Sequence, residues 1–274
     1  MTHALRRGLV YAVLLAVTFV LLFPLLYAIS GSLMSAQELS RYPPALLPSS
    51  PRLTSFRDVL QAIPLGRQYL NSAVVAIAVT TGQLATATLS AYAFAFLRFP
   101  LRNLAFGAFL ATMMIPWEAV IIPNYLFMAQ NGLVNTYPAL ILPFLAAGFG
   151  TFLLRQFFMS FPRDLYEAAL VDGCSHLRFL WTILVPLSRP ALASLGIYAF
   201  LQTWNQYFWP LLVTKTSTMQ TLQIVISSLR DTEAATAPNF ILAGVVMALI
   251  PTLLLIYLGQ RHIVRGLTSG ALRG

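Results

Sequence analysis

The chain has 274 residues, of which 58% are hydrophobic and only 9% are charged. Its apolar runs reach the roughly 20 helical residues that cross a hydrocarbon core, which indicates an integral membrane protein rather than a soluble domain. The formal net charge of +9 comes from basic residues scattered between these runs, so we expect no nucleic-acid partner.

The apolar runs should be helices, because unpaired backbone amides are costly in lipid and the runs lack the alternation of barrel strands. We predict an all-α integral membrane protein in which residues 1–274 form one transmembrane domain with six transmembrane helices. The third of these contains Pro116, Glu118 and Pro123, so it should kink or end near the outer interface. The last two look cleanest. The expected spans are about 8–29, 69–97, 104–128, 137–158, 191–213 and 240–259.

The N-terminus allows a second interpretation. Arg6 and Arg7 followed by an apolar run resemble a secretory signal peptide. The run from Gly8 to Ile29 is longer than the roughly 7–15 apolar residues of a signal peptide, and further hydrophobic spans follow. A retained first helix is therefore favoured.

The distribution of basic residues orients the expected spans. With the N-terminus in the cytoplasm, eleven basic residues fall inside and six outside, as the positive-inside rule requires. Both termini should then be cytoplasmic, in a multi-pass protein of a bacterial or archaeal cytoplasmic membrane. The two large outer loops, about 31–68 and 214–239, are irregular or polar and are candidate surfaces for a partner.

A polar segment at about 160–188, here called the EAA segment, interrupts the hydrocarbon-like sequence. Asp164 should favour a short helix through Leu170 by capping and by the helix dipole, and Gly173 should stop it. Ser175 should cap a second helix, which Pro186 should end. We expect this second helix to carry one apolar face, made of Leu177, Leu180, Trp181 and Leu184.

The residues of this segment resemble the EAA loop of ATP-binding-cassette importer permeases. A glycine follows the motif glutamate by six positions, and only Val185 departs from the usual leucine. The matching residues are Glu167, Ala168, Ala169, Asp172, Gly173, Phe179, Ile183, Pro186 and Pro190.

The resemblance extends over most of the chain from the second span onward. The chain looks like the second membrane subunit of carbohydrate importers of the maltose and glycerol-3-phosphate type. Further matching stretches are 99–103, 151–158, 204–210 and the tail 266–270. In such permeases the loop is a coupling helix seated in a cleft of the ATPase, and the tail is a second contact with it. The resemblance assigns ATPase coupling to Glu167, Ala168, Ala169, Asp172, Gly173, Arg178 and Pro186.

The resemblance also implies partners. These are a second permease subunit completing a heterodimer, two ATPase subunits, an extracytoplasmic solute-binding protein and membrane lipid. Lys215 is the only lysine and no P-loop motif occurs, so ATP and Mg should be bound by the partner ATPase and this chain should hold no cofactor. No catalytic constellation occurs either, and Cys174 with three scattered histidines offers no metal site. We therefore expect a translocation subunit that is not an enzyme.

Polar side chains within the spans are candidates for the translocation pathway, because a buried polar group in lipid must be paired or line a wet cavity. An aromatic belt at the outer interface is an equally open interpretation of the aromatic members, and in maltose-type importers the companion subunit supplies most of the sugar site. For Gln83 we favour hydrogen bonding between helices. The pathway or gate candidates are Gln202, Trp204, Asn205, Gln206, Tyr207 and Glu118.

The sequence thus predicts a permease subunit that couples ATPase closure to alternating access for sugars or sugar-like solutes. The same type of importer carrying glycerol phosphates is the alternative. A stand-alone secondary transporter or channel is less favoured, because neither repeat-related halves nor intramembrane ionisable groups are evident.

Overall fold

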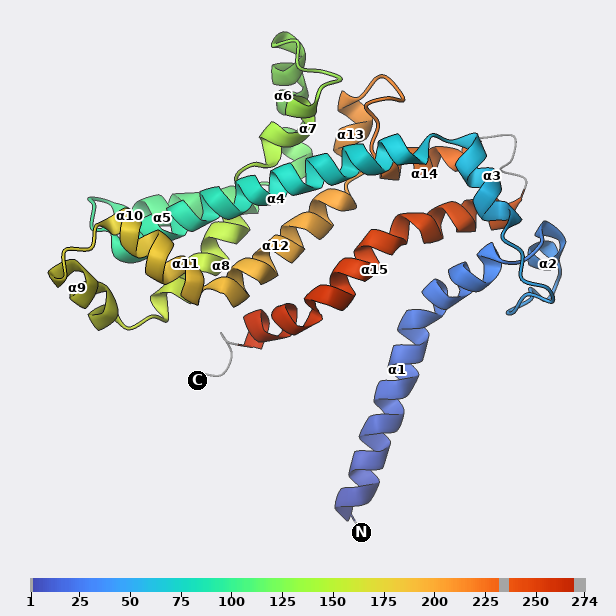
Figure 1. Cartoon of the computed structure of the whole chain (residues 1–274), viewed down its shortest axis with the longest axis horizontal. Helices are drawn as coiled ribbons and strands as arrows, with labels where there is room; N and C mark the ends of the chain where they lie inside the picture. The colour runs from blue at the N-terminus through green and yellow to red at the C-terminus, as the bar shows by residue number, and fades with distance from the viewer. Residues whose placement is uncertain (1, 232–236, 269–274) are drawn as a thin grey trace. The chain divides into compact units, whose positions relative to one another are not determined.

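The computed structural model describes residues 2–231 and 237–268, and within them the only regular structure is helical (Figure 1). Three helices are long and apolar enough to cross a membrane, and the number rises to six if each of three bent helix pairs is one span. The predicted all-helical membrane fold is therefore confirmed. The chain divides into two compact units, residues 1–65 with 225–250 and residues 66–224 with 251–274.

The first unit contains the N-terminal helix α1 (Thr2–Ser32), the short helices α2 (Ala36–Ser40) and α3 (Thr54–Ala62), and the first part of α15 (Pro238–Thr268). None of the most apolar window of α1, within Arg6–Ser32, is buried inside the chain. Such a surface needs lipid or another subunit against it. Asn239 of α15 donates a hydrogen bond of 2.8 Å to the Ser55 hydroxyl of α3.

Glu38 organises the loop that follows α1. Its carboxylate accepts hydrogen bonds from the Ser35 amide at 2.7 Å and hydroxyl at 2.8 Å, and from the Ser49 amide at 2.9 Å. It also accepts one from the Ser49 hydroxyl. Ser35 and Glu38 form a capping box that starts α2, while Ser49 joins the far end of the loop. This expected irregular cap is thus locally ordered around one side chain.

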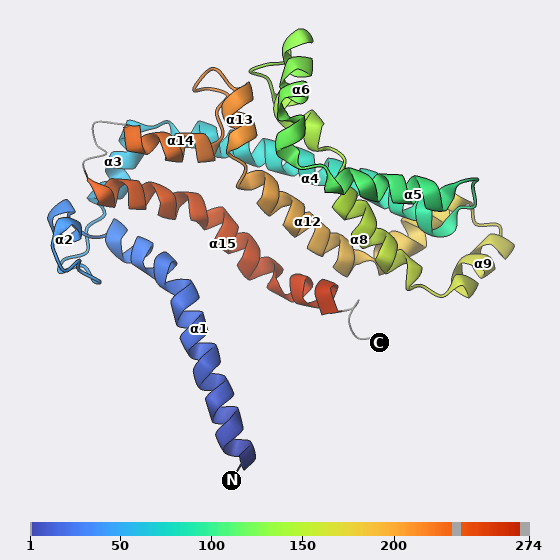
Figure 2. The same ribbon diagram turned by 180° about the vertical axis from the view of Figure 1, so that it is seen from behind.

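The second unit is built on α4 (Leu65–Phe96), along which α8 (Gly148–Met159) and α12 (Arg189–Trp204) pack (Figures 1 and 2). Leu154 of α8 and Leu195 of α12 are fully buried in this core. A Cβ on Gly150 would lie 3.1 Å from Ala87 of α4 and 3.2 Å from Leu195, so the missing side chain permits this close approach.

Three expected spans are not continuous helices. The third breaks before Pro116, where α5 (Arg102–Ala111) and a 3-10 turn meet α6 (Trp117–Gln130) at 93°. A kink was expected there, because proline cannot donate the next helical hydrogen bond. The fourth, expected unbroken over 137–158, bends by 44° between Phe144 and Gly148. Its freed carbonyls at Phe144 and Leu145 accept hydrogen bonds of 2.8 Å from Gln83 and Thr86, as predicted for Gln83.

The fifth expected span, 191–213, is not one continuous helix. Its helix α12 begins at Arg189 and ends at Trp204, and a separate helix α13 (Phe208–Val213) follows a break at 205–207. The remaining elements are α7 (Tyr137–Ile141), 3-10 turns at Thr112–Met114, Leu142–Phe144 and Leu229–Asp231, α9 (Arg163–Val171), α10 (His176–Phe179), a π-helical turn (Leu180–Leu184), α11 (Val185–Leu187) and α14 (Leu222–Ser228).

Candidate functional site

The first helix of the EAA segment, α9, begins after Pro162 without a side-chain cap, so capping by Asp164 is not observed. Asp164 lies in the first turn, where its charge favours the helix dipole. At the other end Gly173 has φ +75°, and its amide donates to the Leu170 carbonyl at 3.0 Å. The Cys174 amide donates to the Ala169 carbonyl at 2.9 Å. This pair of bonds is a Schellman motif, which confirms that glycine stops the helix.

The second helix of the segment begins at the predicted cap, since the Ser175 hydroxyl accepts a hydrogen bond of 3.4 Å from the Arg178 amide. It continues through Leu187, one residue beyond Pro186, and then meets α12 at 80°. A π-helical turn at Leu180–Leu184 precedes the proline. Pro186 has no N–H for the Thr182 carbonyl four residues earlier, and the local widening of the helix accommodates that missing bond.

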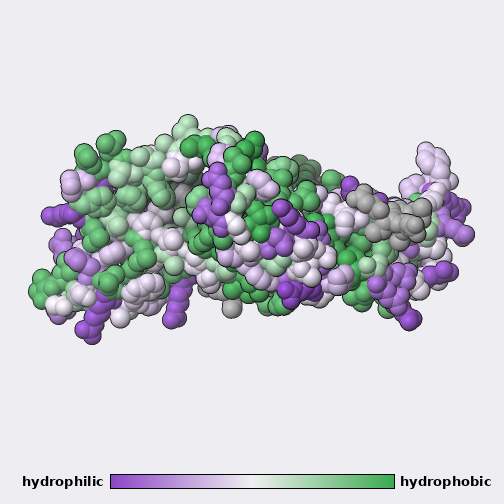
Figure 3. Space-filling view, turned by 90° about the horizontal axis from the view of Figure 1, so that it is seen from above, coloured by the Kyte–Doolittle hydropathy of each residue, from purple (hydrophilic) through white to green (hydrophobic). Residues whose placement is uncertain are grey.

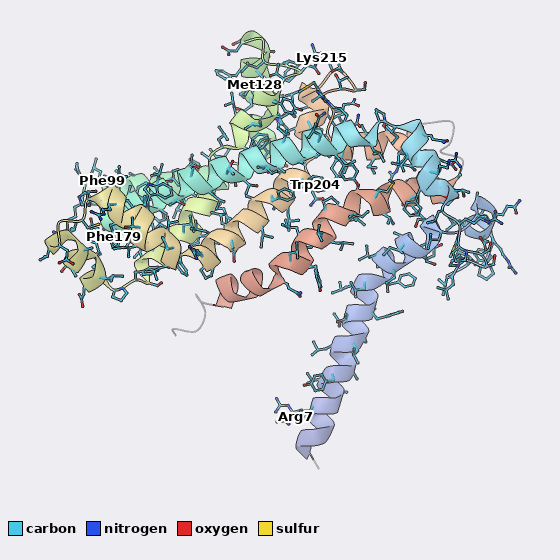
Figure 4. The ribbon with its side chains drawn as sticks, in the orientation of Figure 1. Arg7, Phe99, Met128, Phe179, Trp204 and Lys215 are labelled. Carbon is cyan, nitrogen blue, oxygen red and sulfur yellow. The ribbon has the colours of Figure 1, made fainter. Side chains whose placement is uncertain are left out.

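The expected single apolar face of this second helix is wrong. Leu180 and Leu184 are fully buried, whereas Leu177 is 61% exposed and Trp181 is 51% exposed. The two pairs each have helical spacing of four but occupy different faces, so one pair anchors the segment and the other stays on the surface. Figure 4 shows Phe179, also buried, beneath the end of α4.

The residues of the EAA motif divide between two faces of α9. Glu167 and Ala168 are exposed, and Val171, one turn further on, is 88% exposed. Ala169 is 7% exposed and belongs to the core cluster that contains Leu154, Phe179 and other residues of α4, α8 and α12. Asp172 and Arg178 are exposed beyond it. The motif therefore presents an outward surface on a helix that is anchored from behind.

An aromatic cluster that the sequence did not reveal joins both short helices to α4. The Tyr166 hydroxyl of α9 lies 2.8 Å from His176 Nδ1 of α10, and the two rings are stacked. The Tyr166 ring is 4.9 Å from that of Phe96 and 5.0 Å from that of Phe179. Tyr92 of α4 also approaches His176 Nδ1, at 3.5 Å. The only sequence signal was the spacing of aromatic residues along three separate elements, which is common in any core.

The pathway candidates gather at the break between α12 and α13. Gln202, Asn205 and Tyr207 are exposed, and Gln206 is partly buried. Asn205 Nδ2 donates to the Leu201 carbonyl at 2.9 Å, which closes the end of α12, and Gln223 Nε2 lies 3.5 Å from its Oδ1. An interrupted helix places polar backbone and amide side chains together, the arrangement expected beside a wet pathway rather than lipid.

Two of the candidates differ from this group. Trp204 is only 3% exposed; its ring stacks on Phe200 at 5.7 Å and lies 6.1 Å from Tyr69 (Figure 4). Glu118 belongs to α6 and is exposed in the first turn after the bend at Pro116. Its charge there favours the helix dipole.

Buried polar residues near the start of α4 were missed in the sequence. Asn71 is fully buried and donates hydrogen bonds of 2.9 Å to the carbonyls of both Thr218 and Gln220. The Tyr137 hydroxyl donates to Asn71 Oδ1 at 2.7 Å, and Ser72 Oγ accepts from the Leu222 amide. These residues clamp the second outer loop to α4. Only their position at a helix end, next to a long apolar run, distinguished them in the sequence.

The EAA segment and the break after Trp204 contact α4 near its two ends. The EAA segment contacts Tyr92 and Phe96, and Trp204, the residue just before the break, lies against Tyr69. At 1.5 Å per residue, Tyr69 and Phe96 lie about 40 Å apart along the helix. One rigid element thus links the two candidate sites.

The sequence of this chain matches a family of known proteins. The model of the family described as binding-protein-dependent transport system inner membrane component matches residues 83–269, which include the EAA segment and the break. The chain belongs to this permease family. The expected tail contact at 266–270 lies partly outside the described residues, because Ser269 and Gly270 are not described.

Relatives of the permease match over nearly its whole length. The sn-glycerol-3-phosphate transport system permease protein UgpE of Yersinia pestis is 38% identical, covering 96% of this chain and 98% of the relative. UgpE of Rhizobium meliloti is also 38% identical, over 91% and 92% of the two chains. A crystal structure of a bacterial transporter importing the acidic polysaccharide alginate superposes with a TM-score of 0.82 at 26% identity, covering 93% of this chain and 95% of the other.

The permease is therefore a multi-pass protein of the bacterial inner membrane and a subunit of a binding-protein-dependent importer complex of the ATP-binding-cassette type. Permease subunits of this family are not enzymes, and a separate ATPase binds the nucleotide. The predicted class of protein is confirmed, while the roles of individual residues remain predictions.

Proposed function

We propose that the EAA segment transmits closure of two ATPase subunits to the transmembrane helices, and that the exposed break after Trp204 lines the solute pathway. The observation that supports the coupling role is that α9 has two different faces. Glu167, Ala168 and Val171 are exposed, whereas Ala169 is buried against the core. A helix displaced by a partner moves the spans only if its other face is packed into them. The close packing of protein interiors supplies that rigidity.

The contacts behind α9 define the route of this displacement. Ala169, Phe179, Leu180 and Leu184 are buried in the cluster that includes Leu154 of α8 together with residues of α4 and α12. The second helix also leads directly into α12, with only Ser188 between α11 and Arg189. A push on α9 is thus delivered to three spans, one of which ends at the pathway break. This coupling is a differential fit of the segment to two states of the ATPase.

The solute we propose is a sugar or a sugar-like, polyhydroxylated molecule, with glycerol phosphates as the alternative. The relatives support this class, since they are named for sn-glycerol-3-phosphate and for an acidic polysaccharide. Gln202 and Asn205 carry exposed amides and Tyr207 an exposed ring, and these groups suit the hydroxyl and apolar faces of such solutes. We propose that a second permease subunit completes the pathway and that an extracytoplasmic binding protein delivers the solute.

In this proposal both termini and the EAA segment are cytoplasmic. Cysteine cross-linking tests the sidedness and the partner together, in a Cys174→Ser background that removes the only native cysteine. Val171→Cys, at a site 88% exposed, should cross-link to the ATPase subunit in the assembled importer. Tyr42→Cys, at a site 95% exposed in the first outer loop, is the control and should not. A Tyr42 cross-link without a Val171 cross-link would reverse the proposed orientation.

Function is tested by solute uptake and ATP hydrolysis in proteoliposomes that contain the permease, its partner, the ATPase and the binding protein. Glu167→Lys reverses an exposed charge without touching the core, so insertion should be normal while uptake per ATP falls at least about tenfold. Asp58→Lys, an exposed charge reversal on α3, is the control for charge alone. Normal uptake by Glu167→Lys would remove this residue from coupling. A ligand screen on the binding protein, with maltose-like sugars against glycerol phosphates, decides the solute.

A further inference from the structure

Three arginines line one cavity at the end of α4, beside the EAA segment. The cavity measures about 590 Å³, and Arg98, Arg102 and Arg163 contribute its charged lining. Asn103 adds an amide, and the apolar side chains of Phe99, Leu101 and Leu104 complete the lining. Figure 4 shows Phe99 at the same end of this unit as Phe179. No acidic side chain lines the cavity, so its positive charge is uncompensated.

None of these three arginines forms an ion pair with another described residue. Arg102 donates to the Leu97 carbonyl at 3.1 Å, while Arg98 and Arg163 have no hydrogen-bond or ionic partner there. Arg155, whose guanidinium lies 3.9 Å over the Phe106 ring, adds like charge near Arg102. The cavity also lies at the N-terminal end of the ten-residue helix α5, where the helix dipole favours an anion. Its charge and geometry therefore fit a phosphate group.

A second hollow follows farther along α5. It measures about 430 Å³, has an almost wholly apolar lining, and ends against Phe152 of α8. Leu104, Gly107 and Ala111 share one face of α5 and lead from the arginine cavity into this groove. The eleven residues from Leu104 to Met114 span about 15 Å at helical rise, a length that accommodates much of an acyl chain. Figure 3 shows hydrophilic groups set among hydrophobic surface at the end that carries α5 and α9.

We propose that the arginine cavity and the apolar groove of α5 together bind an anionic phospholipid, with the phosphate among the arginines and an acyl chain along α5. A cationic cavity alone would suit any anion, and an apolar groove alone would suit any hydrophobic partner. Their succession on one membrane helix fits a molecule that is charged at one end and hydrocarbon at the other. Because Arg163 is the first residue of α9, the bound headgroup also steadies the start of the EAA segment.

Binding is measured by native mass spectrometry of the full chain in neutral detergent, titrated with dioctanoyl phosphatidylglycerol, dioctanoyl phosphatidylcholine or inorganic phosphate. The anionic lipid should bind at least about tenfold more tightly than either other probe. A phosphate affinity equal to that of the anionic lipid would identify a free-anion site and overturn the lipid assignment. Equal affinities for phosphatidylglycerol and phosphatidylcholine would show that the arginines do not recognise the lipid charge, and would overturn the proposal.

Charge and groove are then tested separately. Arg98→Gln with Arg163→Gln should weaken phosphatidylglycerol binding on the order of 25-fold, since each basic residue near an anionic surface contributes a factor of about five. Arg52→Gln with Arg57→Gln, two exposed arginines of the first outer loop, is the control and should change nothing.

Gly107→Leu fills the groove without disturbing the fold, because no atom lies within 4 Å of a Cβ placed there. It should weaken phosphatidylglycerol binding at least about fivefold. Gly8→Leu, on α1 with equally open space, is its control. Unchanged lipid binding by both the arginine pair and Gly107→Leu would overturn the proposal. If these variants bound the lipid normally but no longer assembled with the ATPase subunit, the surface would be assigned to a protein partner instead.

Discussion

The Tyr166 hydroxyl lies 2.8 Å from His176 Nδ1, so the two short helices of the EAA segment are joined across the turn at Gly173. The Tyr166 ring also contacts Phe96 at the end of α4. The outward surface of α9 is thus tied to α4, whose other end lies against Trp204 just before the break at 205–207. This link carries the proposed coupling, and the first three predictions test its parts.

Tyr166→Phe removes the hydroxyl and keeps the ring contacts. We expect a loss of about 0.5–1.5 kcal/mol in the interaction between the two short helices, with solute uptake per ATP reduced by about two- to tenfold. The assay is uptake and ATP hydrolysis by the assembled importer in proteoliposomes. Tyr198→Phe on α12, whose ring packs on Phe149, controls for loss of a tyrosine hydroxyl. Unchanged coupling in Tyr166→Phe would exclude the hydrogen bond as a mechanical link.

Gly173→Ala places a Cβ on a residue with φ +75°, which costs about 1–2 kcal/mol although no atom lies within 4 Å of that Cβ. The turn should relax away from the Schellman geometry and lower uptake per ATP, while the thermal unfolding midpoint falls by only a few degrees. Gly132→Ala is the matched control, because Gly132 has φ +66° and equally open space but follows α6, outside the EAA segment. Equal transport defects in both variants would attribute the effect to strain alone.

We expect opposite effects from enlarging the two adjacent alanines of the motif, Ala168 and Ala169. Ala169→Leu overpacks the core beneath α9 and should lower the free energy of unfolding by about 1–3 kcal/mol. Ala168→Leu adds the same atoms to an exposed position, so stability should stay within about 0.5 kcal/mol while ATPase docking weakens. Thermal unfolding of the purified permease and co-purification of the ATPase separate the two effects. A stability loss in Ala168→Leu would contradict the assignment of faces.

The hydrogen bonds that Glu38 accepts from Ser49 and Ser35 lower its pKa from 4.5 to about 2. A lowered pKa in the folded state stabilises the loop fully above pH 4.5 and loses that contribution as the pH falls toward 2. The first outer loop should therefore stay ordered at neutral and mildly acidic pH and loosen below about pH 3. Glu38→Gln should loosen it at pH 7, since an amide cannot accept the same set of bonds.

Spin-label mobility at Leu47→Cys, in the Cys174→Ser background, measures this loop order. Glu118→Gln at the start of α6 is the control, because no partner of the Glu118 side chain is found among the described residues. Unchanged mobility between pH 7 and pH 2.5 would show that Glu38 does not organise the loop.

Short-range chemistry made the EAA segment predictable. Glycine at position 173 had to take a positive φ to end α9, and Ser175 had to cap the next helix, because each signal acts within a few residues. The motif spacing then identified the family. Leu177 and Trp181 were expected on one apolar face with Leu180 and Leu184, yet only the last two are buried, because burial depends on which separate elements pack against the helix and the apolar pattern does not encode that.

The sequence by itself determined that this chain consists of membrane helices interrupted by a polar segment of two short helices, since hydrocarbon length and helix-end signals are local properties. Only the tertiary structure showed that the fourth and fifth expected spans also break. Gln83 and Thr86 satisfy carbonyls some 60 residues away at the bend before Gly148, and no local signal announces such a bond. The same holds for the Tyr166–His176 link and for the arginines that meet Arg163 across two elements, because those contacts exist only once separate helices have packed.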